Sequence, residues 1–541
     1  MQRKHVVPGW AGALAGLVAG GVALGVAQLV AGVVGPRTFP VVAVGDVAVD
    51  LAPPPVKNFA IETFGENDKA VLIGGVLVVL ALVAAAIGIL ACRRLVLGYL
   101  GLAAFGVVGV LAVLTRPDGR PLDVLPTVVG VLAGAWALRW LVRRITIPSD
   151  RAVPSGQAVP GERGESSRGA AGVEWPAVMR AEGEPLVFDR RRLLTGAAGG
   201  VVIAGAATVL GRELAGRRMV DSARIAVRLP APATPARPLP PGVDFGINGL
   251  SPFVTPNQRF YRVDTALIVP QVDPETWTLR IHGMVDRPIE LTYADLLKRP
   301  LTEADVTLAC VSNEVGGPYV GNARWLGVRM ADLLREAGIQ SGADMLLSTS
   351  DDGFTCGTPV DVVTDGRDAL FAIAMNGEAL PVDHGFPVRQ VVPGLYGYVS
   401  ATKWVVDVKV TRFDRDEAYW TPRGWAAQAP IKTESRIDLP GAGASLKPGR
   451  TTIAGVAWAQ HTGIDAVEVR VDRGVWQQAR LAQVPGPDTW RQWALDWDAP
   501  VGRHTIEVRA TDAAGRTQTE RQAPPAPDGA TGWHTIDVKV A

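Results

Sequence analysis

The chain has few of the side chains from which common metal and redox sites are built. Its 541 residues include three cysteines, Cys92, Cys310 and Cys356, and no CxxC pair, which excludes an iron–sulfur cluster or a zinc site of the usual kind. None of the six histidines lies in a long apolar run, which excludes a haem held by two histidines within a membrane. The formal net charge is only +1, so nothing indicates a nucleic-acid partner.

Long apolar runs are abundant in the N-terminal part of the chain, and the mean hydropathy of +0.18 is high for a soluble protein. Four runs are long enough to cross a bilayer as a helix, and a fifth is shorter. They are Trp10–Val34, Ala70–Cys92, Leu95–Leu114, Leu122–Val142 and Leu193–Leu210. We therefore expect a four-span transmembrane bundle in residues 1–144 and a fifth transmembrane helix in residues 189–212, both with an anchoring or packing role.

Basic residues flank these runs at ends that would share one side of a membrane. They are Arg3, Lys4, Arg93, Arg94, Arg139, Arg143 and Arg144. The positive-inside rule assigns all of them to the cytoplasm. The acidic loop 35–69 and everything after Leu210 would then lie outside. The sequence therefore predicts a multi-pass protein of the cell membrane with a cytoplasmic N-terminus and an extracytoplasmic C-terminal part.

Two connecting segments separate the apolar runs from the rest of the chain. Residues 145–188 are rich in Gly, Ser, Pro and Arg, which predicts a disordered cytoplasmic linker. The sequence DRRRLLT follows at residues 189–195 and resembles a twin-arginine export signal, although an ordinary positive-inside flank explains it equally well. Residues 213–244 include PAPATPARPLPP, which favours a semi-rigid, extended stalk.

Two soluble domains are expected after the stalk. Residues 245–425 mix strand-like and helical runs, which predicts an α+β domain. Residues 426–541 alternate strand-like runs with turns, which is typical of a β-sandwich. The α+β runs are Trp277–His282, Tyr293–Lys298, Met330–Ala337, Met345–Ser348 and Trp404–Val410. The sandwich runs are Thr452–Trp458, Ala466–Asp472, Thr489–Trp497, His504–Thr511 and Trp533–Val540.

The stretch Thr307–Gly317, TLACVSNEVGG, places Cys310 where a buried strand would end. A small polar, Gly-rich loop follows, so the thiol could face a cleft while a bulky group approaches the backbone. A buried structural cysteine is the simpler interpretation. A Cys310–Cys356 disulfide is a further alternative, and it would exclude metal ligation by Cys310.

Several motifs accompany Cys310 in one order and spacing. They are PNQRFYRVD at Pro256–Asp264, MNG at Met375–Gly377, LPVDHGFPVR at Leu380–Arg389 and PGLYGYVSATKW at Pro393–Trp404. With Cys310 they resemble the molybdenum-cofactor domain of the sulfite oxidase family, over roughly Phe245–Ala541. The resemblance implies a molybdopterin-binding catalytic domain followed by an immunoglobulin-like domain that often mediates dimerisation. It also implies a molybdenum–molybdopterin cofactor whose metal is held by two pterin sulfurs and Cys310.

The resemblance assigns the remaining site residues. Arg389 and Lys403 fall where the family binds the phosphate and the pterin, and a guanidinium fork suits a phosphate. His384 offers a ring donor to the pterin, although a lone histidine is more often a turn residue. Arg262 matches an arginine beside the metal that can contact the oxo ligand or the substrate, with a surface salt bridge to Asp264 as the alternative. The other expected cofactor-binding residues are Phe260, Tyr261, Asp264, Asn313, Asp351, Gly394, Tyr396 and Gly397.

Departures from the family pattern bear on the substrate. Sulfite-oxidising relatives carry an arginine pair where this chain has Glu314 and Val315, and a tyrosine where it has Pro422. We therefore expect two-electron oxygen-atom transfer on a small substrate other than sulfite, in either direction, with sulfite oxidation as the alternative. A separate electron carrier, cytochrome or quinone-linked, and a homodimer are also expected. The rival hypothesis is a catalytically inactive, membrane-tethered binding module.

Overall fold

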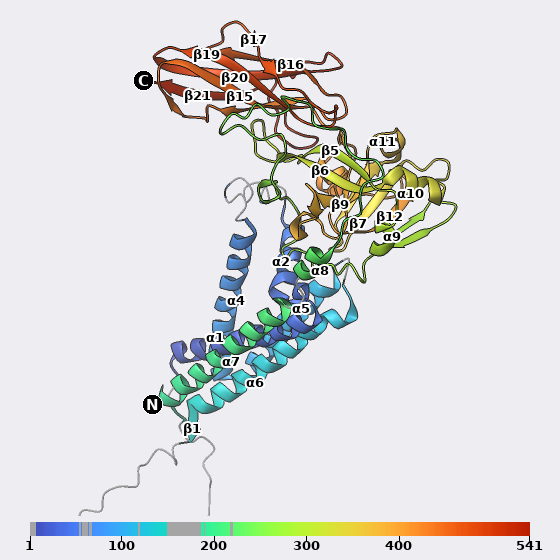
Figure 1. Ribbon diagram of the computed structural model, residues 1–541. Coiled ribbons are helices and arrows are strands. Elements are labelled where there is room, and N and C mark those ends of the chain that lie inside the picture. The colour runs from blue at the N-terminus through green and yellow to red at the C-terminus, as the bar shows by residue number, and fades with distance from the viewer. Residues whose placement is uncertain are drawn as a thin grey trace, which may run out of the picture. The chain divides into compact units, whose positions relative to one another are not determined.

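The computed structural model describes residues 7–53, 68–116, 119–148, 186–188, 190–216 and 220–541, together with Val56 and Thr63. They belong to two compact units, Met1–Arg218 and Met219–Ala541 (Figure 1). Arg3, Lys4 and most of the predicted linker lie outside the described residues.

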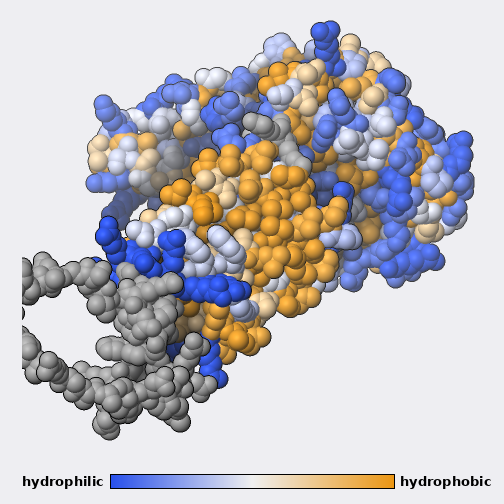
Figure 2. All heavy atoms as spheres, turned by 90° about the horizontal axis from the view of Figure 1, so that it is seen from below, coloured by the Kyte–Doolittle hydropathy of each residue, from blue (hydrophilic) through white to orange (hydrophobic). Residues whose placement is uncertain are grey.

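The first unit is helical. Within the described residues, five helices are long and apolar enough to cross a membrane, which confirms the five predicted runs as helices. They are α1 (Gly9–Val34), α4 (Asp68–Arg93), α5 (Leu95–Leu114), α6 (Leu125–Ile145) and α7 (Arg190–Gly216). Their outward side chains include many exposed Val, Leu and Ile residues, and Figure 2 shows a broad hydrophobic face on the molecule. Such a surface suits lipid contact better than water.

Small residues bring the helix backbones of this unit close together. A side chain at Gly16 on α1 would collide with the Ala84 carbonyl oxygen on α4, and one at Gly88 would collide with the Gly12 carbonyl oxygen. A Cβ at Gly25 would lie 2.6 Å from the Ala204 carbonyl oxygen of α7. Close backbone packing through small residues is the usual basis of helix association in membranes. The Gly- and Ala-rich composition of α1 is therefore explained by its contacts with both α4 and α7.

Among the described residues of this unit, one helix was not predicted. Helix α2 (Pro40–Leu51) lies in the segment expected to be a loop, after the short 3-10 turn η1 (Pro36–Thr38). Proline at the first helical position is favourable, because its fixed φ suits a helix and its missing N–H has no partner there anyway. Asp46 on α2 pairs with Arg116 after α5 at 3.3 Å. The acidic residues that suggested a solvent-exposed loop thus include one held by an ion pair.

The ends of the predicted linker pair with each other. Strand β1 (Thr146–Pro148) runs antiparallel to β2 (Leu186–Phe188), with Ile147 opposite Val187. These short strands contradict the expectation that residues 145–188 have no regular structure at either end. Residues 149–185 lie outside the described part of the chain, so disorder there stays a prediction.

The second unit begins with an α+β region built on two five-stranded sheets. The first has the order β4-β3-β12-β7-β8, from β3 (Thr278–Gly283), β4 (Ile289–Thr292), β7 (Met345–Ser350), β8 (Thr355–Pro359) and β12 (Val405–Thr411). The second has the order β10-β9-β6-β5 with β11 on β9, from β5 (Thr302–Ala309), β6 (Val320–Arg329), β9 (Leu370–Met375), β10 (Glu378–Ala379) and β11 (Arg389–Val391). The helices are α9 (Tyr293–Leu297), α10 (Met330–Ala337) and α11 (Val360–Thr364).

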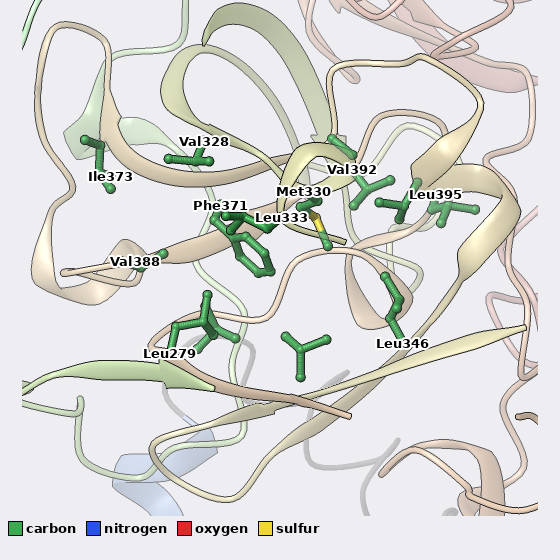
Figure 3. Packing of buried hydrophobic residues seen from close by; sticks show 14 of the residues in the cluster. Leu279, Val328, Met330, Leu333, Leu346, Phe371, Ile373, Val388, Val392 and Leu395 are labelled. Carbon is green, nitrogen blue, oxygen red and sulfur yellow. The ribbon is translucent and has the colours of Figure 1, made fainter. Parts of the chain in front are cut away.

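The core of this region joins both sheets and helix α10 (Figure 3). Leu279 and Leu346 come from the first sheet, Val328 and Phe371 come from the second, and Leu333 comes from α10. All five are at most 3% exposed. Burying each such side chain contributes about 1.5–3 kcal/mol, so this core fixes the two sheets against each other. The strand ends that carry the candidate site are therefore held on a rigid frame.

A two-sheet β-sandwich follows, as the alternating runs predicted. One sheet has the order β13-β15-β19-β18, from β13 (Glu434–Leu439), β15 (Gly449–Trp458), β18 (Arg480–Leu481) and β19 (Arg491–Ala499). The other has the order β14-β21-β20-β16-β17, from β14 (Ser445–Leu446), β16 (Ile464–Val471), β17 (Gln477–Gln478), β20 (Gly502–Asp512) and β21 (His534–Val540). Inward side chains of both sheets, such as Ile453, Trp493, Val508 and Val538, form one buried cluster.

The predicted stalk packs against the soluble unit from residue 220 onward. The Thr234 N–H donates to the Leu301 carbonyl at 3.1 Å, and the Glu303 N–H donates to the Thr234 carbonyl at 2.8 Å. These bonds cover β5, the edge strand of its sheet, and an uncovered edge is prone to wrong pairing. In α8 (Asp221–Ala226), the Arg224 side chain donates to the Leu380 carbonyl at 2.8 Å. The segment is therefore a strap on the α+β region.

We predict that Gly88→Val destabilises the helical unit by about 1–3 kcal/mol, because its side chain has no room against the Gly12 carbonyl of α1. Gly75→Val on the same helix is the control, since a side chain there meets nothing within 4 Å. Thermal unfolding of the detergent-solubilised protein measures both variants. Equal losses of stability in the two variants would contradict the proposed packing.

Candidate functional site

Cys310 directly follows strand β5 and is 8% exposed. Its N–H donates to the Tyr319 carbonyl at 2.9 Å, and its Sγ accepts the Ser312 N–H at 3.4 Å. Burial raises the pKa of the Cys310 thiol. The thiolate form therefore needs a positive charge close to the sulfur, such as a metal ion.

The disulfide alternative is wrong, because both Cys310 and Cys356 are free thiols. The Cys356 thiol donates to the Tyr398 carbonyl at 2.9 Å, and its own burial raises its pKa to about 11. Cys356 is thus an inert, buried residue of β8. Cys310 remains available as a ligand.

A buried guanidinium is the most unusual feature near Cys310. Arg389, the first residue of β11, is 5% exposed, and burial lowers its pKa to about 10. It donates to the His384 carbonyl at 3.1 Å and lies 5.0 Å from the Trp325 ring centroid. Among the described residues no carboxylate pairs with Arg389, and its acceptors are backbone carbonyls. A buried cation without a counter-charge is costly, so this environment favours an anionic ligand.

Lys403 supplies a second buried cation. Its Nζ donates to Asp264 at 2.7 Å and to the Asp383 carbonyl at 3.0 Å. Burial lowers the pKa of Lys403 to about 8, and the Asp264 carboxylate opposes this shift. The same Asp264 oxygen accepts Nε of Arg262 at 2.9 Å, so the expected salt bridge is present. Asp264 therefore ties the 256–264 arm to the motif that carries Lys403.

His384 is neutral in this structure, because burial lowers its pKa to about 4. Its Nε2 lies 3.2 Å from the Asn257 carbonyl oxygen, which only accepts, so this nitrogen carries the proton. The other ring nitrogen, Nδ1, is then an acceptor. The donor role expected of His384 toward a ligand thus requires a different protonation state, whereas an acceptor role does not.

Aromatic side chains of the arm pack between these groups. The Phe260 ring lies 5.2 Å from Tyr261 and 5.8 Å from Trp325, between ring centroids. The pKa of Tyr261 is raised by burial and then by the Cys310 charge, whereas Arg389 lowers it. Tyr261 therefore lies close enough to both Cys310 and Arg389 for each charge to affect it.

Two glycines allow the motif loops to approach the site. A Cβ at Gly397 would lie 3.6 Å from the Ala309 carbonyl and 3.9 Å from the Tyr261 hydroxyl. Gly385 has a φ of +111°, and a Cβ there would lie 2.9 Å from Cβ of Arg389 and 3.1 Å from Cβ of Lys403. A side chain at Gly385 would push the two cations apart. Gly385 was not among the predicted site residues, although its HGFP motif was noticed.

The other predicted residues divide into two groups. Asn313 and Asp351 form the first group, which supports the loops of the site. Oδ1 of Asn313 accepts the Tyr319 N–H at 2.8 Å within the cysteine loop. The Asp351 N–H donates at 2.8 Å to the carbonyl of Trp404, which directly follows Lys403. Gly394 and Tyr396 instead face the sandwich. A Cβ at Gly394 would lie 2.8 Å from Arg367 Nη1 and 3.2 Å from Cβ of His461 on a sandwich loop, and the Tyr396 hydroxyl donates to Glu434 at 3.3 Å.

Asn376 of the MNG motif is a residue that the sequence analysis did not place. Its Nδ2 donates to the Thr255 carbonyl at 3.0 Å and to Asn257 Oδ1 at 2.7 Å, while its Oδ1 accepts the Arg324 N–H at 2.9 Å. Asn376 has a φ of +53°, which asparagine tolerates better than most residues. The motif therefore fixes the arm that brings Tyr261 to Cys310. Its position in a turn between two strands was the available signal.

The donor set fits a metal-bearing, anionic organic cofactor. Within the described residues, no group of three or more His, Cys, Asp or Glu side chains could hold a metal ion. A metal bound to Cys310 would then take its remaining ligands from a non-protein group. Arg389 and Lys403 suit the phosphate or other acidic part of such a group.

Residues 266–420 match the family described as "Oxidoreductase molybdopterin binding domain". The chain is 30% identical over 342 residues to mitochondrial sulfite oxidase of Mus musculus, covering 53% of this chain and 62% of the relative. It is 32% identical over 176 residues to the uncharacterized oxidoreductase YuiH of Bacillus subtilis, covering 32% of this chain and 85% of the relative. The chain thus spans about three-fifths of the mouse enzyme. These matches imply a molybdenum cofactor.

A solved structure, the sulfane dehydrogenase SoxCD from Paracoccus pantotrophus, also resembles the chain. The sequence identity is 25% and the TM-score is 0.48, and the match covers 54% of this chain and 82% of that one.

We predict that Cys310→Ser folds but loses turnover, because a hydroxyl is a much poorer soft-metal ligand than a thiolate. The loss should exceed the roughly 10–100-fold that removal of an outer-shell partner costs. Cys356→Ser is the matched control, since a serine hydroxyl can keep the hydrogen bond to Tyr398. Turnover per protein and circular dichroism of both variants test this. Full activity of Cys310→Ser would exclude Cys310 as the ligand.

Proposed function

Because the chain belongs to the sulfite oxidase family of molybdopterin-dependent oxidoreductases, we propose that it is a membrane-anchored enzyme of oxygen-atom transfer. The observation that carries this proposal is a set of three buried groups, the Cys310 thiol, Lys403 and Arg389, of which Arg389 has no carboxylate partner among the described residues. In a protein that had lost its cofactor, burying these cations would still cost free energy of folding, but no anionic ligand would offset that cost. Metal analysis of the purified protein distinguishes the enzyme from an inactive binding module.

The residues of the site divide the work of holding the cofactor. When bound, the molybdenum cofactor supplies two-electron redox chemistry and the centre for oxygen-atom transfer. Cys310 would ligate the metal as a thiolate, Arg389 and Lys403 would bind the phosphate and pterin, and Nδ1 of His384 would accept a pterin N–H. In the reducing direction an oxide takes up two electrons and two protons and releases water. In the oxidising direction the same balance runs in reverse.

Two of the cations that could have bound an anionic substrate already form ion pairs with carboxylates. Arg262 pairs with Asp264 at 2.9 Å, and Arg324 pairs with Asp305 at 2.8 Å. Asp305 of β5 lies opposite Arg324, and Cys310 follows five residues later, just after the strand ends. Arg324 is therefore about 17 Å from Cys310, measured along the strand. These pairs favour a substrate without a strong negative charge.

Arg423 is a further cation that could contribute to a site for an anionic substrate. Its guanidinium carbon lies 3.7 Å from the Tyr419 ring centroid, and Nη1 donates to the Tyr419 carbonyl at 2.6 Å. Glu314 is exposed, so water screens its repulsion of an anion and its effect is smaller than the sequence suggested. The argument against sulfite as the substrate therefore rests on two observations. The sequence lacks the arginine pair of sulfite-oxidising relatives, and Arg262 and Arg324 are paired with carboxylates. We propose a small neutral or cationic S-oxide, N-oxide or thioether as the substrate.

We predict that kcat/KM for sulfite is lower than for the best neutral oxide by about 10–100-fold, the effect of one missing charged hydrogen bond. Steady-state kinetics with an artificial electron carrier measure this, comparing sulfite with a panel of S- and N-oxides and thioethers. Cys310→Ser protein provides the background rate. A higher value for sulfite, with no turnover of the other compounds, would establish sulfite oxidation as the activity instead.

We also propose that the five apolar helices anchor the catalytic unit outside the cytoplasmic membrane. No histidine lies in these helices, so electrons would pass through a separate carrier. The sandwich would serve as the immunoglobulin-like, dimerisation-type domain of a homodimer. Export of the folded unit would use the arginines at the start of α7, Arg190 and Arg191.

We predict that a protease site inserted beside Val475, on an 84% exposed turn, is cut when protease is added to intact spheroplasts. The same site inserted in residues 151–185 should be cut only after lysis, because the arginine clusters assign that segment to the cytoplasm. The opposite pattern would overturn the topology.

Arg190→Lys with Arg191→Lys should trap the soluble unit inside if folded export is used.

A further inference from the structure

The loop that carries Cys310 is braced by the C-terminal sandwich. We propose that Glu434 and Arg436 of strand β13 are positioning residues that fix the Cys310 loop, so that the sandwich completes the cofactor site. The proposal rests on Cys310 as the metal ligand, and hence on the proposed function. It assigns the sandwich a role inside each chain, separate from any role between chains.

Arg436 holds the far end of the loop. Its Nη1 donates to the Gly317 carbonyl at 2.9 Å. Its Nε donates to Asp438 at 2.7 Å and its Nη2 donates to the Ser251 hydroxyl at 2.9 Å, so the guanidinium is fixed on three sides. The Arg436 side chain is only 12% exposed. A charged hydrogen bond of this kind, shielded from water, is among the stronger ones in proteins.

Glu434 acts on the middle of the loop. It is 4% exposed and accepts the Tyr396 hydroxyl at 3.3 Å. The Asn313 amide lies next to the same carboxyl and lowers its pKa, although Nδ2 of Asn313 makes no well-aligned hydrogen bond. Oδ1 of Asn313 accepts the Tyr319 N–H, and the Tyr319 carbonyl accepts the Cys310 N–H. Polar contacts therefore join Asn313 to Cys310 within the loop, and the hydrogen bond from Arg436 to Gly317 joins β13 to the same loop.

The carboxyl of Glu434 is protonated at neutral pH, because burial raises its pKa to about 8. The Asn313 amide, the Tyr396 hydroxyl and the nearby Lys432 ammonium favour the ionised form, but less strongly than burial opposes it. Glutamine resembles a protonated glutamate in size and charge. Glu434→Gln is therefore a conservative variant that keeps an acceptor for Tyr396 and Asn313.

A third contact closes the loop against the sandwich. Gly316 has a φ of +80°, and a side chain there would collide with the imidazole of His534 in β21. Nδ1 of His534 accepts the Ile437 N–H at 2.9 Å, which fixes the ring on β13. Gly316 is thus explained by the sandwich face that it touches, whereas a side chain at Gly317 would meet Asn313 and Glu314 of the loop itself.

The strand leading to Cys310 is fixed in the same way. The Thr307 N–H donates to the Asp488 carbonyl at 2.9 Å, and the Thr307 hydroxyl accepts the Trp490 N–H at 2.7 Å. Nε2 of Gln460 donates to the Thr307 carbonyl at 3.0 Å. Sandwich residues therefore contact both sides of Cys310 along the chain, three residues before it and three to seven residues after it.

The test measures how readily Cys310 reacts in the full-length protein made in cells that cannot synthesise the cofactor. Iodoacetamide labelling, read by peptide mass spectrometry, gives the rate at Cys310 with buried Cys356 as the internal reference. Loss of one charged hydrogen bond should raise this ratio by about tenfold in Arg436→Met, and loss of the neutral hydrogen bond of Glu434 should raise it by about threefold in Glu434→Ala. Arg470→Met is the matched control, since Arg470 pairs with Glu507 at 2.6 Å elsewhere in the sandwich.

Glu434→Gln should keep the wild-type labelling ratio, whereas a general loss of stability would raise both cysteine rates together. In protein made with the cofactor, Glu434→Ala and Arg436→Met should hold less molybdenum per chain than the control. An unchanged ratio in both variants, or an equal rise in Arg470→Met, would overturn the proposal. Faster labelling at Cys310 in a chain that binds no molybdenum even as wild type would instead refute the proposed function and leave the bracing intact.

Discussion

The cost of burying positive charge is the constraint on which the site depends. Arg389 and Lys403 are both less than 9% exposed, and within the described part of the chain Lys403 has a carboxylate partner, Asp264, whereas Arg389 has none. A buried guanidinium satisfied only by carbonyls is stable because the sheets, the arm and the motif loops hold it there. Arg262 pairs with the same carboxylate, so the described residues Arg262, Lys403 and Arg389 have one hydrogen-bonded carboxylate among them, which leaves a local excess of positive charge. An anionic cofactor would balance this charge, which links the fold directly to the chemistry.

The same constraint applies to the Cys310 thiol as well as to the cations. Burial disfavours the Cys310 thiolate, and the buried Arg389 charge is disfavoured for the same physical reason. Each would be stabilised by a group carrying both a metal ion and a phosphate. Asp264 accepts hydrogen bonds from both Lys403 and Arg262 and so holds these two cations together.

Sequence patterns predicted what depends on local periodicity and motif spacing. The bounds of α5 and α10 and the end of β5 at Cys310 were predicted, because apolar runs and strand alternation are local signals. Helix α2 was missed because Pro40 also suits a loop. The strap along β5 was taken for a free stalk, since a proline-rich composition does not reveal what lies beside it. The sequence analysis did not predict the contacts of Glu434 either. Residues Glu434–Leu439, ESRIDL, have the pattern of an ordinary half-exposed strand, which does not indicate what the strand packs against.

The placement of Gly394 and Tyr396 shows the limit of motif transfer more sharply. Both belong to the motif that contains Lys403, yet their side-chain positions face the sandwich, with Tyr396 bonded to Glu434. One motif thus has two sets of contacts: Gly397 and Lys403 face the region of Cys310 and the 256–264 arm, while Gly394 and Tyr396 contact the sandwich. A single thiolate is the only protein ligand expected for the metal, so its position must be fixed by its own loop. Bracing that loop from a second domain supplies rigidity that a short glycine-rich segment lacks by itself.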